Sequence, residues 1–261
     1  MTKIDWARRI ERCADLAERY PSAAELLAFY RHILEFQSAL GAAIPSSGDD
    51  LPFRERLDLY SAARQLPALL ALVRQKGPSK LALEAADVSR SGSEDQRKML
   101  RSFLTSPGSN DPESNPFFAR VLFQPCAEYL AATATARSAA GFGSVCPVCA
   151  GRPQIAVLRP EGDGGKRFLV CSFCITEWEF RRILCPVCDE EDYQKLPRYS
   201  AEEIAAVRVE ACETCKYYLK SVDMTVDGRA VPIVDEVAAA PLGVWALEHG
   251  FSKISLNLMG F

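Results

Sequence analysis

The sequence predicts an α+β fold, in which an N-terminal α-helical domain is followed by two tandem four-cysteine β units and a C-terminal helix. Apolar residues recur at helical spacing over residues 1–104, and four Cys-x-x-Cys pairs lie between residues 146 and 215 with short strand-like segments among them. We expect the helical domain at 1–140, the first cysteine unit at 141–183 and the second unit with the C-terminal helix at 184–261.

The first part of the chain is expected to form a helical bundle. Amphipathic stripes predict helices over 4–20, 22–41 and 57–76, the last bent or broken around Pro67. The segment 105–116 has the composition of a loop. A further helix is expected over 117–138, kinked at Pro125. The apolar stripes are interpreted as the core of the bundle.

After Gly143 the pattern changes to short strands. The segments "RPQIAVLRP" and "KRFLVC" flank the turn "EGDGG" and predict a β-hairpin. The segments "EWEFRRI", "AAVRVEAC" and "KYYLKSV" predict further short strands. From Asp235 to Gly250 the pattern returns to helix, with an interruption expected at Pro241.

Composition indicates an ordinary globular protein, since 48% of the 261 residues are hydrophobic and 25% are charged. No apolar run reaches the roughly 18 residues that a membrane span needs. The charged, helical start "MTKIDWARRIERCADLAERY" has no signal-peptide core. We therefore expect a cytoplasmic protein without membrane insertion, in which thiols stay reduced.

The charge distribution argues against a nucleic-acid partner. The net charge is −3, and the residues after 140 carry 13 basic against 17 acidic side chains. Nucleic-acid binding draws most of its affinity from Lys and Arg on phosphates. We therefore expect no nucleic acid among the partners.

Eight of the ten cysteines form four pairs with metal-knuckle spacing: Cys146/Cys149, Cys171/Cys174, Cys185/Cys188 and Cys212/Cys215. The first two pairs are separated by 21 residues and the last two by 23, which leaves room for a hairpin in each interval. We expect each hairpin to bring two pairs together into one tetrahedral four-sulfur metal site. Such sites lack an open position for substrate, which favours a structural role. Cys13 and Cys126 lie in helical patterns and are interpreted as buried apolar residues.

Other uses of these thiols stay open. Dithiol redox chemistry usually relies on a single Cys-x-x-Cys near a βαβ pattern, and a disulfide framework needs an oxidising compartment. Four thiolates suit zinc and a single iron equally. The motif "CPVC" occurs at 146–149 and 185–188 and resembles the rubredoxin knuckle, so each unit is expected to be rubredoxin-like or a zinc ribbon. Ala150 and Asp189 stand where a glycine often follows that knuckle.

The order of these motifs resembles the FdhE family of bacterial formate dehydrogenase accessory proteins. The resemblance is carried by "CPVCAGRP", "GGKRFLVCSFCITEWEFRRILCPVC" and "VRVEACETCKYYLKSV". It covers roughly residues 141–261 and, more loosely, the helical half. Asp235-Glu236 stands where family members tend to carry paired aspartates, and Asn257-Leu258 replaces their Asn-Pro.

The resemblance implies a cytoplasmic accessory or maturation factor that binds the catalytic subunit of formate dehydrogenase and supports its assembly or activity. It favours two rubredoxin-type iron sites, with zinc as the other metal, and it implies no enzymatic turnover. The alternative is a thiol- or iron-dependent redox protein that acts on a metalloenzyme precursor.

Candidate partner-binding residues lie beside the second knuckle and before the C-terminal helix: Glu177, Trp178, Arg181, Arg182, Asp235 and Glu236. Trp178 has a second interpretation as a plug of the small core between the two units. Asp235 and Glu236 have one as favourable charges at the positive N-terminal end of a helix.

Overall fold

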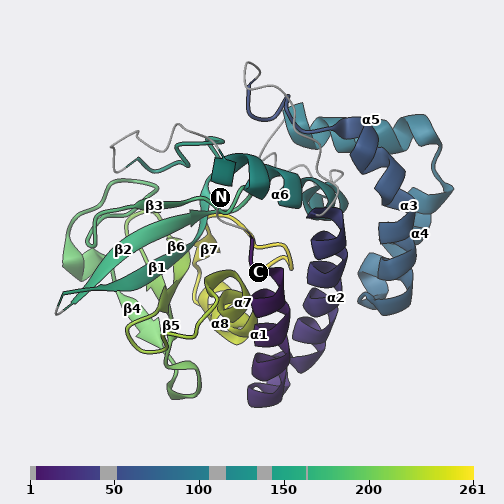
Figure 1. The fold of residues 1–261 in the computed structure, drawn as a ribbon. Coiled ribbons are helices and arrows are strands. Elements are labelled where there is room, and N and C mark those ends of the chain that lie inside the picture. The colour runs from purple at the N-terminus through teal and green to yellow at the C-terminus, as the bar shows by residue number, and fades with distance from the viewer. Residues whose placement is uncertain (1–3, 42–51, 106–115, 134–142, 163) are drawn as a thin grey trace.

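The computed structural model describes residues 4–41, 52–105, 116–133, 143–162 and 164–261. Its first half is helical (Figure 1), with α1 Trp6–Arg19, α2 Ala24–Gly41, α3 Leu59–Lys76, α4 Ser79–Arg90, α5 Ser93–Thr105 and α6 Pro116–Thr133. A 3-10 turn, Pro21–Ala23, joins α1 to α2. The expected domain boundary near residue 140, most of the loop 105–116 and the end of the helix expected over 117–138 lie outside the described residues.

Local sequence explains where two of these helices begin. The Asp5 carboxylate accepts a hydrogen bond from the Arg8 amide (3.0 Å) and caps α1. The Asp58 carboxylate accepts the amides of Tyr60 (2.8 Å) and Ser61 (3.1 Å) at the start of α3. These bonds satisfy amide groups that a helix leaves unpaired at its first turn.

Both internal prolines are accommodated within continuous helices. α3 runs through Pro67 and α6 runs through Pro125, so neither helix is broken there. A proline inside a helix removes one hydrogen bond at a cost of about 3 kcal/mol. In α3 this cost is offset by buried apolar side chains on either side of the proline, namely Leu66, Leu69, Leu70 and Val73.

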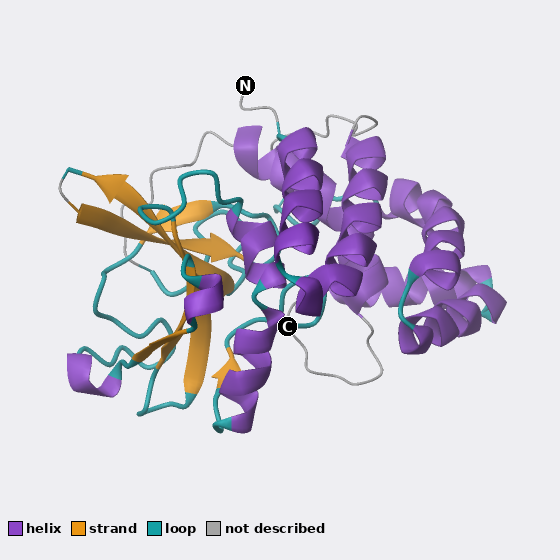
Figure 2. Cartoon of the chain, turned by 90° about the horizontal axis from the view of Figure 1, so that it is seen from below, coloured by secondary structure: helices purple, strands orange, loops and turns teal. Residues whose placement is uncertain are grey.

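The second half contains a sheet of seven strands: β1 Pro153–Glu161, β2 Gly164–Cys171, β3 Glu177–Glu179, β4 Arg198–Ser200, β5 Val207–Ala211, β6 Tyr217–Asp223 and β7 Ser252–Lys253. The order is β3-β2-β1-β6-β5-β4, with β7 beside the start of β6. The expected hairpin is β1 with β2, whose turn includes residue 163, outside the described part of the chain. Figure 2 shows the strands on one side of the molecule and most helices on the other.

One parallel pairing joins the two cysteine units into a single sheet. β1 and β2 are antiparallel, as are β5 and β6, and each hairpin belongs to one unit. β1 then pairs with β6 in parallel, with Ile155 opposite Lys220 and Leu158 opposite Asp223. The expected tandem units therefore share one continuous hydrogen-bonded layer.

The main hydrophobic core lies between the helices and the first unit. It combines Leu27 of α2 and Phe118 of α6 with Ile155 of β1 and Cys171 of β2, all four without exposed surface. A smaller core in the second unit contains Val209 and Tyr218 and is covered by α8. Among the described helices, none is both long enough and apolar enough to cross a lipid bilayer.

The C-terminal helical region consists of α7 Pro232–Ala238 and α8 Ala240–Glu248. The break falls at Ala239, and Pro241 lies in the first turn of α8, where a proline is tolerated because that amide has no helical partner. The interruption expected at Pro241 is therefore displaced by two residues.

α7 carries two buried carboxylates that face different parts of the fold. Asp235 pairs with Arg12 of α1 at 2.5 Å and also accepts the Val231 amide at 2.7 Å. Glu236, fully buried, pairs with Lys220 of β6 at 3.0 Å and with Lys253 of β7. Burial alone would raise the pKa of Glu236, but the two ammonium groups hold it below its usual value.

Replacing Glu236 by glutamine should destabilise the protein strongly. The variant leaves the two buried lysines without a counter-charge, and breaking a buried pair in this way costs about 3–5 kcal/mol. The exposed Glu248 of α8 is the matched control, and Glu248→Gln should change stability by less than about 0.5 kcal/mol.

Urea unfolding of both variants measures this difference. Because the folded-state pKa of Glu236 is lowered, its contribution should be complete above the unfolded pKa of about 4.3 and be lost as the pH falls through the folded value. Equal unfolding midpoints for the two variants at neutral pH would contradict a stabilising role for the buried pair.

Candidate metal centres

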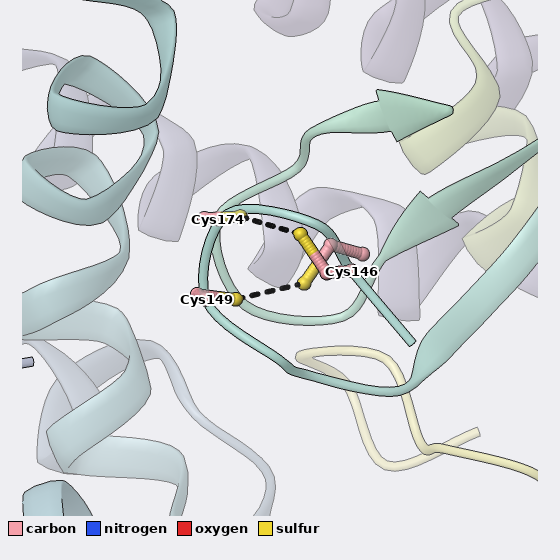
Figure 3. A group of neighbouring side chains, drawn as sticks. Cys146, Cys149 and Cys174 are labelled. Carbon is pink, nitrogen blue, oxygen red and sulfur yellow. Dashed lines mark hydrogen bonds between the residues drawn. The ribbon is translucent and has the colours of Figure 1, made fainter. Parts of the chain in front are cut away.

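The first cysteine group is assembled at one end of the β1–β2 hairpin. Cys146 and Cys149 precede β1, Cys171 ends β2 and Cys174 follows it. The Sγ atoms of Cys146 and Cys174 are 3.5 Å apart and those of Cys149 and Cys171 are 3.4 Å apart, and all four lie within 4.8 Å of one another (Figure 3). All four residues are buried. A tetrahedron with metal–sulfur bonds of about 2.3 Å has sulfur–sulfur edges of about 3.8 Å, so these distances fit one metal ion.

The second group is assembled in the same way at the open end of the β4–β5 hairpin. Cys185 and Cys188 precede β4, and Cys212 and Cys215 follow β5. The Sγ distances are 3.7 Å for Cys185 with Cys215 and 3.6 Å for Cys188 with Cys212. Cys185 and Cys212 are buried, whereas Cys188 and Cys215 reach the solvent. The two groups combine the pairs as the spacing predicts, first with second and third with fourth.

All four knuckles share one backbone conformation. The residue after each second cysteine is left-handed, with φ between 56° and 61°: Ala150, Ile175, Asp189 and Lys216. In each knuckle the amide of the first cysteine donates to the carbonyl oxygen five residues later, at 2.8 to 2.9 Å. A left-handed residue other than glycine costs about 1–2 kcal/mol, so the turns form despite the missing glycines.

The knuckle backbone also points amide groups at sulfur. The amides of Val148, Phe173 and Val187 each lie 3.4 Å from the Sγ of the cysteine two residues earlier. Such bonds favour the thiolate form, which is the form that binds metal.

Gly151 allows the first group to close. A Cβ atom at this position would lie 3.0 Å from the Sγ of Cys171 and 3.2 Å from the Sγ of Cys149. Any larger residue would therefore displace sulfur atoms of the group.

The crowding of the sulfurs makes a cation the natural occupant of each group. Hydrogen bonding from Cys149 lowers the pKa of Cys146, whereas bonds to Cys146 and Cys149 raise the pKa of Cys171 well above its usual value. In the second group, burial raises the pKa of Cys185 to about 11. A bound metal cation allows all four thiols of a group to ionise together. Four thiolates suit zinc or a single iron, and the donor set does not separate these metals.

The two groups differ in their surroundings. The first lies against the helices, where the Arg54 guanidinium stacks over the Phe173 ring at 4.9 Å. Arg120 of α6 donates to the Ser172 carbonyl at 2.7 Å and also to the carbonyls of Leu256 and Asn257 near the C-terminus. The four cysteines of the first group belong to the core shared with the helices, whereas those of the second do not, and two of them reach solvent.

The predicted partner-binding residues beside the second knuckle differ in exposure. Trp178 is only 7% exposed and its Nε1 donates to the Gly143 carbonyl at 2.9 Å, which agrees with the plug interpretation. Glu177 pairs with Arg159 at 2.5 Å. Arg181, paired with Glu191 at 2.5 Å, and Arg182 are both exposed. These two arginines are therefore the members of the set that present charge to the surface.

Asp235 and Glu236 require a correction. The expectation of a partner contact needs an exposed carboxylate, but the two residues are 4% and 0% exposed. Their oxygens are occupied by Arg12, Lys220 and Lys253. We therefore assign both residues to the packing of α7.

The roles of three residues that support the site were not predicted from the sequence. Lys220 lies in the apolar strand "KYYLKSV". A lysine among apolar residues of a strand indicates an internal ion pair, so this role could have been predicted. Arg120 and Gly151 carry no local signal, because their roles depend on segments that are distant in sequence or on sulfur positions.

Replacing Ala150 by glycine should stabilise the first knuckle. Glycine adopts the left-handed conformation without strain, so the metal-loaded protein should gain about 1 kcal/mol. The matched control is Ala68→Gly at an exposed position of α3, which should lose about 1 kcal/mol. Thermal melts compare the two variants. A lowered melting temperature for Ala150→Gly would contradict backbone strain at Ala150 in the wild-type protein.

Comparison with known proteins finds similarity to one family. Family models described as the central domain and the C-terminal domain of FdhE match residues 145–182 and 183–259. An FdhE homolog from Aquifex aeolicus is 27% identical over 97% of this chain and 94% of its own length. Protein FdhE from Salmonella paratyphi A is 27% identical over 96% of this chain and 86% of its own length.

A solved structure agrees with these matches. The crystal structure of the FdhE protein from Pseudomonas aeruginosa has a TM-score of 0.75 and 25% sequence identity, and the match covers 99% of this chain and 96% of that one. The resemblance to the FdhE family predicted from the cysteine motifs is thereby confirmed.

Proposed function

We propose that this chain is a cytoplasmic accessory protein that binds the catalytic subunit of formate dehydrogenase and supports its assembly or activity. The observation that carries the proposal is the presence of two four-thiol groups of metal-site geometry in a fold of the FdhE family. The protein acts by binding rather than by turnover, since four sulfur ligands fill the coordination of a metal and leave no position for substrate. Nucleic acid is not among the proposed partners.

Each group of four cysteines would hold one metal ion. The ligands of the first are Cys146, Cys149, Cys171 and Cys174, and those of the second are Cys185, Cys188, Cys212 and Cys215. Family resemblance favours iron, with zinc as the other candidate. Iron bound by four thiolates supplies a one-electron redox centre, whereas zinc supplies structural closure only.

The proposed partner surface surrounds the third knuckle. Exposed apolar and cationic side chains gather in this stretch of the sequence: Ile183 is 46% exposed and Val187 is 37% exposed, next to the exposed Arg181 and Arg182. A surface that mixes apolar and arginine side chains suits a protein partner. We also propose the division into 1–140, 141–183 and 184–261, with the helical part covering the first centre and the last part presenting the second.

A redox protein acting on a metalloenzyme precursor is the second candidate. The solvent-reaching cysteines of the second group, Cys188 and Cys215, favour it, because electron exchange or thiol chemistry needs access to the sulfur atoms. The absorption spectrum of anaerobically purified protein distinguishes the candidates. Ferric-thiolate bands that bleach with a mild reductant support the redox candidate, and a colourless zinc protein supports the accessory role alone.

Loss of a ligand should destabilise the two centres unequally. Binding at a structural four-thiolate site contributes on the order of 10 kcal/mol. Cys171→Ser removes a ligand buried in the core shared with the helices and should lower the melting temperature of the whole protein. Cys188→Ser acts at the surface and should leave the far-UV signal of the helices intact.

Metal content per chain and thermal melts test this difference. Cys126→Ser, a half-buried cysteine outside both groups, is the control and should retain both metals. If Cys171→Ser and Cys188→Ser have the same melting temperature, loss of a ligand at the first centre destabilises the core no more than loss at the second.

Partner capture should depend on the third knuckle. Val187→Glu places a charge on the proposed surface and should reduce retention of the formate dehydrogenase catalytic subunit about tenfold or more. Val226→Glu, at a 59% exposed valine after the opposite end of β6, should leave retention unchanged.

The measurement is a pull-down from cells that express formate dehydrogenase, with a known complex captured in parallel. Equal melting temperatures show that both variants are folded. No retention by the wild-type chain, while the known complex is retained, would refute the proposed partner.

A further inference from the structure

A cationic cavity lies beside the second cysteine group. Its volume is about 410 Å³, and its walls include the buried ligand residues Cys185 and Cys212. Most other wall residues are apolar or aromatic, among them Leu184 and Tyr217. Its charged lining residues are Arg167, Arg182, Arg198 and Glu210.

An ion pair between strands that are not neighbours forms part of the cavity wall. Arg167 of β2 pairs with Glu210 of β5 at 2.9 Å, although β1 and β6 lie between these strands. In a flat sheet, strands three places apart are separated by roughly 14 Å. The contact therefore joins two strands that are not neighbours across the wall of the cavity.

The arginine and carboxylate side chains of the cavity are mostly cationic. Three arginines face one glutamate, so these four side chains carry a formal charge of +2 in a chain whose net charge is −3. A divalent metal held by four thiolates would add a charge of −2 on the side of the wall formed by Cys185 and Cys212. Arg167 is 5% exposed and fixed, since it donates to the Arg181 carbonyl at 2.9 Å in addition to its pair with Glu210. The single carboxylate of the cavity is thus already engaged.

Arg182 and Arg198 have no carboxylate partner among the described residues. Arg182 donates to the Gly165 carbonyl at 3.1 Å, and Arg198 makes a long contact of 3.5 Å with the Arg182 carbonyl. Burial lowers the pKa of Arg198, and the nearby Arg208, Arg182 and Arg167 lower it further against the effect of Glu210. An anion between these guanidinium groups would relieve their mutual repulsion.

We propose that this cavity binds a carboxylate group carried on an apolar segment of polypeptide. The planar donors of arginine match a carboxylate and form charge-assisted hydrogen bonds with it. The apolar walls would contact the residues that flank the acidic one. The volume is that of a small-ligand site, which admits a few side chains and excludes a folded element.

This inference rests on the proposed function for its claim that the ligand is a protein. It adds the recognition chemistry, namely an acidic residue within an apolar stretch of the partner. Because Cys185 and Cys212 form part of the wall, the metal centre would hold the cavity in shape.

The test uses the full-length, metal-loaded chain and an array of immobilised apolar hexapeptides in which one position is Glu, Gln or phosphoserine. Wild-type protein should bind the Glu peptides roughly tenfold to a hundredfold more tightly than their Gln counterparts. The variant Arg182→Gln/Arg198→Gln should lose this preference. Arg74→Gln, at an exposed arginine of α3 outside both the cavity and the proposed partner surface, should keep it.

Thermal melts and the single variants Arg182→Gln and Arg198→Gln show whether any loss arises from unfolding. Equal binding of Glu and Gln peptides by the wild-type chain would overturn the proposal. So would tighter binding of phosphoserine peptides together with displacement by inorganic phosphate, since the site would then be one for phosphate.

The peptide array tests the cavity assignment, and the pull-down tests the proposed function, so either claim can be refuted without the other. Selective binding of Glu peptides without retention of the catalytic subunit would refute the proposed function and leave the cavity assignment standing. Retention of the subunit by Arg182→Gln/Arg198→Gln at the wild-type level would refute the cavity as its binding site alone.

Discussion

Two consecutive buried carboxylates on α7 connect the helical half of the protein to its sheet. Asp235 reaches Arg12 of α1, and Glu236 reaches Lys220 in the middle of β6 and Lys253 in β7. Buried charges are tolerated only when they are paired and hydrogen-bonded. A neutral replacement for one partner leaves the other charge unpaired in the low-dielectric interior. The position of α7 between α1 and β6 is thereby defined by charge pairing on both of its sides.

This arrangement gives the two cysteine groups different surroundings. With α7 in place, the helices close over the first unit, and Arg120 of α6 ties the Ser172 carbonyl to the C-terminal segment. The first cysteine group thus belongs to the same core as Leu27 and Phe118. The second group is held by its own hairpin and a smaller core, beside the arginine-lined cavity. One group is enclosed by the core shared with the helices, and the other lies nearer the surface.

The sequence predicted those features that depend on local spacing. A hairpin of about twenty residues decides which cysteine pairs meet, so the composition of both groups followed from the intervals alone. The helices, the β1–β2 hairpin and the strands β5 and β6 likewise followed from periodicity, whereas the short strand β4 did not. The parallel pairing of β1 with β6 did not, because Ile155 and Lys220 are far apart in the chain and neither strand carries a signal for the other. Glu236 was misjudged because a glutamate near a helix start is usually exposed, and its two lysine partners lie in other elements.

Parallel pairing of β1 and β6 also decides where the two centres lie. Cys149 precedes β1 and Cys215 precedes β6, so both knuckles lie at the same rim of the sheet. Antiparallel strands of this length would have placed them roughly 20 Å apart at opposite rims. Helices cover the first centre at this rim, whereas Cys188 and Cys215 of the second reach solvent. Exchange of a metal at the first group would require the helices to separate from the sheet, while exchange at the second would require only local motion of a surface turn. Two neighbouring groups with one ligand set thus differ in access, and the cause is the packing around them.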